Sequence, residues 1–386
     1  MLSAIALGIA ATLLMTALLR GMSHNMLEDN LQILPGHLQI QAPAYFQDPS
    51  LQHSLRWPNT DLLELLEAEP AVTGWTPRLV RQVMVQSERV NSALLLIGVD
   101  PERDAMVSFF AEQPDLLRKL VDPNEAKVLL GRSAVKRLKT AVGRRIVVTT
   151  QDHRGDLAES GLTVVGQFVG LFESLENRYA FAHIATVQRL TGLASSASFI
   201  AVKTEDYSTL EGLGKRLAAA LGPDLHFISW QQLDPYLQGI LQLMNAVVII
   251  WAIIVFIAMA FGLINAMAMA VFERTAEFGL VQALGWRPSQ VVWVVMLEAM
   301  MLLIIGISAG SLLAWAIALP MQGGIEFDLF AEGLKAFGSR PVLYPTLILK
   351  DVIIIDALVL LCGLLASLSP ALSACRLKPT DAIRSA

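Results

Sequence analysis

Charged residues are scarce in this sequence, at 16% of 386 residues, whereas a soluble globular protein usually carries about a quarter. Hydrophobic residues reach 54%. Spread evenly they would make the surface insoluble, so they must be concentrated in particular segments. The formal net charge of -5 gives no basic face and argues against a nucleic-acid partner. The two cysteines, Cys362 and Cys375, lie in or beside the last apolar segment, so no disulfide framework is indicated elsewhere.

Motifs for catalysis, metal binding and nucleotide binding are also missing. The six histidines show no H-x-x-x-H spacing, so no metal site is predicted. The serines lack a nucleophile elbow, so no hydrolase site and no catalytic residue is predicted. No G-x-x-x-x-G-K-[ST] phosphate loop occurs. The chain is therefore expected to hold no cofactor and to have no ATPase activity of this kind.

Four apolar runs are long enough to span a membrane, which needs roughly 20 residues. They cover residues 2–19, 240–272, 291–319 and 352–372. The first run could instead be a cleaved signal peptide, but it lacks a basic n-region and a small-x-small cleavage site. Two acids, Glu298 and Asp356, lie near the ends of the third and fourth runs, and edge placement is favoured over an ion pathway.

About 220 residues of ordinary soluble composition lie between the first two runs. Strand-like runs occur at residues 94–99, 145–150, 162–168 and 199–202, and helix-like runs at 62–68, 133–139 and 210–221. The sequence therefore predicts an α-helical membrane protein with four transmembrane helices. A large α+β domain, in two lobes, is inserted between helices 1 and 2.

Helical spacing continues past the membrane on both sides of this domain, at Leu27, Leu31 and Leu34 before it and from Leu233 after it. Both helices are therefore expected to project as a stalk. The predicted segments are transmembrane helix 1 at 1–21, a stalk helix at 22–36, the inserted domain at 37–230, stalk plus transmembrane helix 2 at 231–272, a loop helix at 273–289, transmembrane helix 3 at 290–320, a second loop at 321–351, transmembrane helix 4 at 352–373 and a tail at 374–386.

Basic residues favour a cytoplasmic tail. Arg376, Lys378 and Arg384 lie in the tail, and Arg274 and Arg287 lie in the loop on the same side. The positive-inside rule then places this side in the cytoplasm and the large domain outside, because long domains translocate regardless of their charge.

The loop between the second and third runs has a distinctive sequence. It reads ERTAEFGLVQALG over residues 273–285 and is followed by VVWVVMLEAMML. Phe278, Val281 and Leu284 predict an apolar stripe, and Gly285 is a typical residue after a helix end. A short amphipathic helix on the membrane surface fits this pattern, as does a simple interfacial loop helix.

This stretch resembles the coupling segment of the FtsX/MacB-type ABC transporter permeases, and PALSACRLKPTDAIR at residues 370–384 resembles the family's C-terminal ending. Two other stretches are most similar to the lipoprotein-releasing permeases of the LolC/LolE type: NMLEDNLQILPGHLQIQAP at residues 25–43 and LLLIGVDPERD at residues 94–104. The chain departs from the family at its N-terminus, where a basic amphipathic cytoplasmic helix normally precedes span one.

The resemblance implies partners and a mechanism. The chain would form a dimer, with itself or with a paralogous permease, in a bacterial inner membrane, with the large α+β domain at 37–230 as a periplasmic domain and 321–351 as a periplasmic loop. It would sit on a pair of ABC ATPase subunits that bind ATP and Mg, and a periplasmic chaperone or adaptor is a further partner. ATP binding would shift the coupling helix and move the outer domain through the stalk, a mechanism called mechanotransmission. The residues that would couple to the ATPase are Glu273, Arg274, Glu277, Phe278, Gly279, Leu280, Ala283, Leu284 and Gly285.

Two other residue sets are candidates for contacts. Met22, Met26, Leu27 and Leu31 on the stalk could touch a lipoprotein acyl chain, and stalk-on-stalk packing is the alternative. Ala258 with Gly262, and Gly306 with Gly310, form small-residue faces that suit close helix packing, within one subunit or between two.

Lipoprotein release is the leading functional hypothesis. An efflux permease for peptides or small molecules and a transducer that activates a periplasmic enzyme are the alternatives.

Overall fold

The computed structural model of the chain describes residues 2–32, 36–170, 173–205, 210–221, 224–326 and 342–375. The chain divides into two compact units. Unit 1 consists of Met1–Asn25, Gly239–Leu329 and Pro341–Ala386, and unit 2 consists of Met26–Gln238 and Phe330–Arg340.

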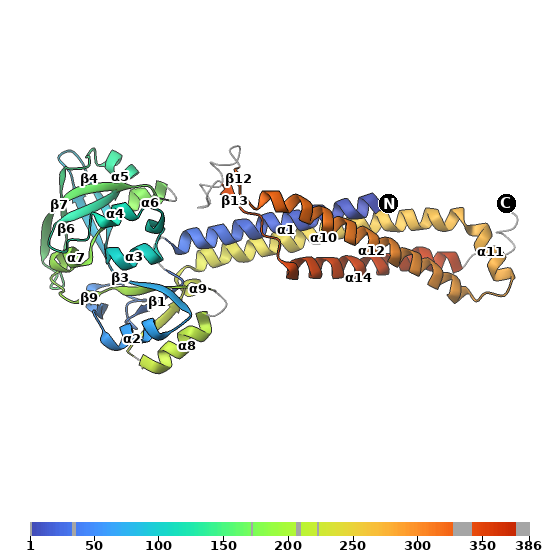
Figure 1. Cartoon of the computed structure of the whole chain (residues 1–386), viewed down its shortest axis with the longest axis horizontal. Coiled ribbons are helices and arrows are strands. Elements are labelled where there is room, and N and C mark those ends of the chain that lie inside the picture. The colour runs from blue at the N-terminus through green and yellow to red at the C-terminus, as the bar shows by residue number, and fades with distance from the viewer. Residues whose placement is uncertain are drawn as a thin grey trace. The chain divides into compact units, whose positions relative to one another are not determined.

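Unit 1 is built from long helices. They are α1 (Leu2–Leu31), α10 (Pro235–Glu273), α12 (Pro288–Met321) and α14 (Leu349–Cys375), and the short α11 (Thr275–Ala283) lies between α10 and α12 (Figure 1). The four long helices are each apolar enough to cross a membrane within the described ranges. A two-stranded hairpin of β12 (Ile325–Glu326) and β13 (Val342–Leu343) lies between α12 and α14 in the chain.

The core of unit 1 joins all four long helices. Ile9 and Leu13 of α1 pack with Met267 of α10, Leu303 of α12 and Val359 of α14 in one apolar cluster. In a bilayer the outward faces of such helices contact lipid, which explains why many of their leucine and isoleucine side chains are exposed.

The residues next to the start of α10 explain why this helix begins at Pro235. A short helix, α9 (Trp230–Leu233), ends just before it. Asp234 Oδ1 then accepts a hydrogen bond from Leu237 N at 2.9 Å, and Pro235 occupies the first helical position, where a missing N–H costs nothing. The helix therefore begins at Pro235, whereas the sequence predicts one continuous helix from Leu233. Its 39 residues extend about 58 Å at 1.5 Å per residue.

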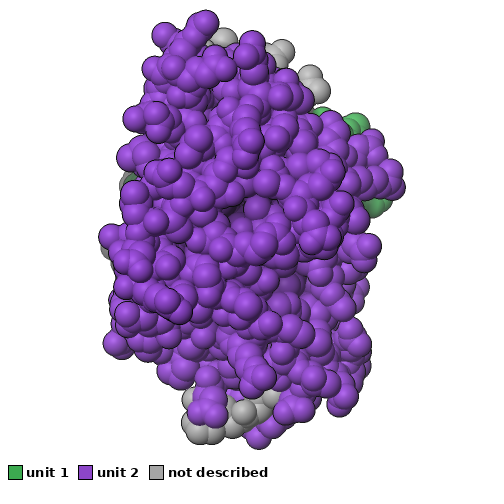
Figure 2. Space-filling model, turned by 90° about the vertical axis from the view of Figure 1, so that its left-hand side faces the viewer, with its two compact units in different colours: residues 1–25, 239–329, 341–386 green, residues 26–238, 330–340 purple. Residues whose placement is uncertain are grey.

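Unit 2 contains a nine-stranded sheet with the order β11-β1-β10-β3-β4-β8-β5-β7-β6. Its strands are β1 (Leu38–Gln41), β3 (Val72–Gln86), β4 (Asn91–Val99), β5 (Lys127–Gly131), β6 (Arg145–Gln151), β7 (Leu157–Phe168), β8 (Tyr179–His183), β10 (Phe199–Thr204) and β11 (His226–Ser229). A small second sheet pairs β2 (Leu55–Arg56) with β9 (Ser196–Ala197). Figure 2 shows one face of this unit as a continuous packed surface.

The long strand β3 holds the sheet together. Its second half pairs with β6 as well as with β4, for example Met84 opposite Thr149, so the strands from β3 to β6 close on themselves. Its first half pairs with β10. The two lobes that the sequence predicts therefore share one strand and one continuous sheet. Buried Leu79, Val83 and Leu96 fill the closed part.

Helices cover this sheet and connect its strands. In chain order these helices are α2 (Thr60–Ala68), α3 (Pro101–Val107), α4 (Pro114–Arg118), α5 (Arg132–Arg137), α6 (Glu173–Arg178), α7 (Ile184–Thr191) and α8 (Leu210–Leu221). The 3-10 helices η1 (Leu51–His53) and η2 (Phe109–Glu112) complete the described elements. The mixture is the α+β fold that the sequence predicts.

Candidate functional site

The site predicted from the loop motif lies on α11, between two membrane-length helices. The backbone at Arg274 leaves helical geometry, with φ -105° and ψ 18°, and separates α10 from α11. Gly285 follows the end of α11 with φ +104°, a left-handed conformation that only glycine adopts without strain. The loop helix is thus Thr275–Ala283, shorter than the predicted range of 273–289.

The inner face of α11 packs on the long helices of unit 1. Gly279 is buried, and Phe278 packs against the apolar cluster formed by the four long helices. This contact fixes one face of α11 and turns the opposite face outward.

The outer face of α11 is apolar and exposed. Ala276, Leu280, Ala283 and Leu284 recur at helical spacing along it, and all four are exposed. The exposed fractions reach 58% for Leu280 and 78% for Leu284. The sequence predicts one stripe of Phe278, Val281 and Leu284. That prediction is wrong in detail, because Phe278 faces the membrane helices while Leu284 faces away from them.

An ion-pair network anchors the N-terminal end of α11. Arg274 Nε lies 3.1 Å from a carboxylate oxygen of Glu277 on α11, and Arg274 Nη1 lies 3.1 Å from Glu298 on α12. The Arg274 guanidinium also lies 5.9 Å from the ring centroid of Phe278. The partner of Glu298 therefore comes from the loop and not from an apolar run, which sequence reasoning missed.

The remaining coupling candidates are at the edges of this face. Glu273, Glu277 and Gly285 are exposed. Trp286, which was not among the predicted residues, is 46% exposed directly after α11. Its position beside a glycine and before Arg287 and Pro288 in the chain is the only sequence signal for it.

The two predicted small-residue faces have different surroundings. On α12, a Cβ at Gly306 would press on Ile5 and one at Gly310 on Ile9, so these glycines allow α12 to pack closely on α1. On α10, Ala258 is exposed and nothing lies within 4 Å of a Cβ at Gly262. Within the described residues no atom packs against Gly262, so a close contact of this face with another subunit stays a prediction.

The predicted stalk contacts are partly covered. Met26 and Leu31 are 4% and 2% exposed, whereas Met22 and Leu27 are half-buried. In this conformation only the latter two offer surface to a hydrophobic ligand. Leu34 lies outside the described residues. No group of three or more potential metal ligands occurs in the described part of the chain.

Two protein families match most of the sequence. Residues 1–220 match the MacB-like periplasmic core domain, and residues 247–379 match the FtsX-like permease C-terminal region.

The chain is similar to proteins of lipoprotein-releasing and macrolide-export systems. It is 23% identical over 396 residues to the lipoprotein-releasing system transmembrane protein LolC of Xylella fastidiosa, covering 98% of this chain and 92% of that protein. It is 23% identical over 393 residues to LolE of Haemophilus influenzae, covering 99% and 92%. It is 25% identical over 346 residues to the macrolide export ATP-binding/permease protein MacB 1 of Yersinia pestis, covering 87% of this chain and 50% of that protein.

Proposed function

This chain belongs to the family of FtsX-like ABC transporter permeases that carry a MacB-like periplasmic core domain, and on that premise we propose that α11 couples it to a separate ATPase subunit and that the transporter releases lipoproteins from the inner membrane. The protein is an inner-membrane protein with a periplasmic domain. In the proposed topology this domain is inserted between α1 and α10, and α11 and the C-terminus face the cytoplasm.

The observation that carries the proposal is the exposed apolar face of α11. A helix with Leu280 at 58% and Leu284 at 78% exposure leaves apolar surface in water unless a partner or lipid covers it. Glu273 and Glu277, at the N-terminal end of α11, are also exposed and would form the rim of a protein interface. Phe278, Gly279 and the ion pairs of Arg274 hold the helix against the bundle, so a push on the outer face reaches α10 and α12.

Lipoprotein release is the proposed activity because LolC and LolE proteins match this chain over nearly its full length. Acyl chains would reach the half-buried Met22 and Leu27 of α1 first, and covered Met26 and Leu31 would become accessible when the helices move. The proposed assembly contains two permeases, identical or paralogous, two ATPases that bind ATP and Mg, and a periplasmic chaperone or adaptor. No substrate needs to cross the membrane in this mechanism.

Efflux of peptides or small molecules is the second candidate, favoured by the match to a macrolide exporter. That relative's name gives both an ATP-binding part and a permease part, and this chain spans half of its length. The two candidates differ in their cargo, because only lipoprotein release involves acylated proteins.

Affinity purification of the tagged chain in mild detergent, followed by mass spectrometry, tests the proposal. We expect a stoichiometric ABC ATPase together with acylated proteins. Glu277→Lys and Gly279→Pro should abolish stimulation of the ATPase by lipoprotein while membrane insertion is unchanged, since proline costs about 3 kcal/mol in this short helix. An eluate without an ATPase, with the chain folded and cross-linking before extraction also negative, would refute the coupling role. An ATPase without acylated proteins would refute lipoprotein release alone.

A further inference from the structure

The two helices that lead into the periplasmic domain are packed very differently in unit 1. In the most apolar 18-residue window of each helix, 39% of the residues of α1 are buried, whereas only 6% of the residues of α10 are buried. Both helices continue beyond unit 1, α1 to Leu31 and α10 back to Pro235. A helix that is enclosed by neighbours moves with them, while a peripheral helix can shift against them.

The inner half of α1 is fastened to α12. A Cβ on Gly306 would come within 2.7 Å of Ile5, and one on Gly310 would come within 2.7 Å of the Ala6 carbonyl oxygen. These backbones are therefore as close as glycine permits. Ile9, beside Gly310, is fully buried.

The outer half of α1 is fastened to the segment 342–348, which leads into α14 and which we call the strap. A Cβ on Gly21 would overlap the carbonyl oxygen of Tyr344, so the strap crosses α1 in direct backbone contact. Asn25 Nδ2 donates to the Val342 carbonyl oxygen at 2.9 Å, and Thr346 N donates to the Ala17 carbonyl oxygen at 3.0 Å.

An ion pair completes this attachment. Arg20 Nε and Nη2 donate to the two carboxylate oxygens of Asp351, at 2.9 and 3.3 Å. Asp351 lies in the first turn of α14, and its side chain is only 16% exposed. A bidentate pair of this kind fixes orientation as well as distance.

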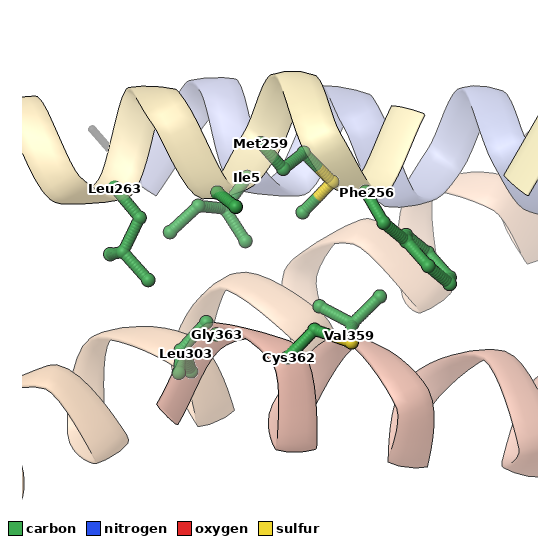
Figure 3. Close-up of a pocket in the computed structure, with 9 residues that line it drawn as sticks. Ile5, Phe256, Met259, Leu263, Leu303, Val359, Cys362 and Gly363 are labelled. Carbon is green, nitrogen blue, oxygen red and sulfur yellow. The ribbon is translucent and has the colours of Figure 1, made fainter. Parts of the chain in front are cut away.

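A small apolar cavity lies between α10 and α14. Phe256, Met259 and Leu263 of α10 line this cavity of about 20 Å³, together with Ile5 of α1 and with Val359 and Cys362 of α14 (Figure 3). A cavity gives these side chains fewer contacts than a packed core would. The outer-end polar ties of α10 to α1 are single bonds to neutral groups, from Arg20 Nη1 to Asn245 at 3.1 Å and from Ser23 to Met244 Sδ at 3.5 Å.

We infer that Arg20, Gly21 and Asp351 are positioning residues that make α1 a fixed member of the bundle, against which α10 slides when the coupling helix moves. The inference rests on the proposed function, because it takes the input motion to enter at α11, the next element after α10. The movement that reaches the periplasmic domain is then a displacement of α10 relative to α1, and the strap keeps α1 from following it.

Distance measurements between spin labels test this directly in the complex with the co-purified ATPase. Leu7 of α1, Ile257 of α10 and Leu361 of α14 are 61%, 54% and 57% exposed, so labels there leave the packing undisturbed. Cys362 and Cys375 are first replaced by alanine, and labelled chains are diluted with unlabelled chains. Between the nucleotide-free and vanadate-trapped states, we expect the Leu7–Ile257 distance to shift by about 2 Å or more and the Leu7–Leu361 distance to stay constant.

The strap variants complete the test. Arg20→Asp and Asp351→Arg should each make the Leu7–Leu361 distance change on trapping and lower lipoprotein-stimulated ATPase activity at least about fivefold. The double variant should restore both readouts, which a merely structural loss would not do. If, in the chain with the unmodified strap, the Leu7–Leu361 distance changes as much as the Leu7–Ile257 distance, the inference is overturned. It is also overturned if the two single variants change neither the distances nor the ATPase activity. Loss of the ATPase from the purified complex would instead refute the proposed function.

Discussion

Truncation of the outer face of α11 should weaken docking of the ATPase without affecting the membrane helices. Burying a whole leucine side chain is worth about 1.5–3 kcal/mol, and Leu280 and Leu284 are 58% and 78% exposed before docking. Covering both therefore stabilises the complex by about 2–4 kcal/mol. Alanine keeps the Cβ, so the double variant Leu280→Ala with Leu284→Ala should lose about 1.5–3 kcal/mol, or roughly 10- to 100-fold in affinity.

The assay is titration of the purified ATPase against the permease in lipid nanodiscs. The matched control is Leu312→Ala with Leu365→Ala, whose side chains are 69% and 63% exposed on α12 and α14. These side chains face lipid in a membrane, so the control should bind the ATPase with unchanged affinity. If the α11 variant binds within twofold of the unmodified chain, or if the control loses as much, the outer face of α11 is not the docking surface.

Three further predictions concern charged and titratable groups. Glu298→Gln removes the α12 partner of Arg274 and should lower coupled ATPase activity about two- to fivefold, because half-exposed pairs contribute up to about 1 kcal/mol. Asp104→Ala removes the carboxylate 2.7 Å from Arg78, whose side chain is 1% exposed, and should cost about 3–5 kcal/mol in urea unfolding of the periplasmic domain. Burial lowers the pKa of His37 to about 4, so only the unfolded state takes up a proton between pH 6.5 and 4. Stability should therefore fall by about 2 kcal/mol from pH 7 to pH 5.

Each of these predictions has its own control. Asp115→Ala breaks a pair whose side chains are 77% and 85% exposed, and it should leave unfolding unchanged within about 0.5 kcal/mol. A similar loss in both variants would contradict the role of burial. His37→Gln should reduce the fall in stability between pH 7 and pH 5, and the remaining slope should come from His183, whose burial also lowers its pKa. An unchanged slope in His37→Gln would contradict the role of His37. Glu298→Asp should retain part of the coupling that Glu298→Gln loses.

The long apolar helices could be predicted from the sequence because the thickness of a bilayer sets their length. The strand-like runs were equally readable, and they lie within β4, β6, β7 and β10. The long strand β3 was not predicted, since Gly74 and Pro77 interrupt its first half and disfavour a strand locally. Pairing with both β10 and β6 outweighs that preference, and such pairing is not a local property of the sequence.

The orientation of the site could not be predicted in full. Phe278 and Leu284 are both apolar, and periodicity alone does not show that one packs on the bundle and the other faces away. Gly262 and Gly310 have the same small-residue spacing, yet only Gly310 meets another helix. The partner of Glu298 is 24 residues away in sequence, a distance at which only the fold brings two charges together.

Site-specific photo-cross-linking from α11 tests the central claim most directly. A photoreactive amino acid replaces Leu284, the most exposed leucine of the outer face of α11. The cross-linked product is identified by mass spectrometry after irradiation of intact cells. The account predicts a single dominant product with an ABC ATPase, and no such product from the same amino acid at Leu312. Cross-links from Leu284 to lipid alone, or to a periplasmic protein, would contradict the account.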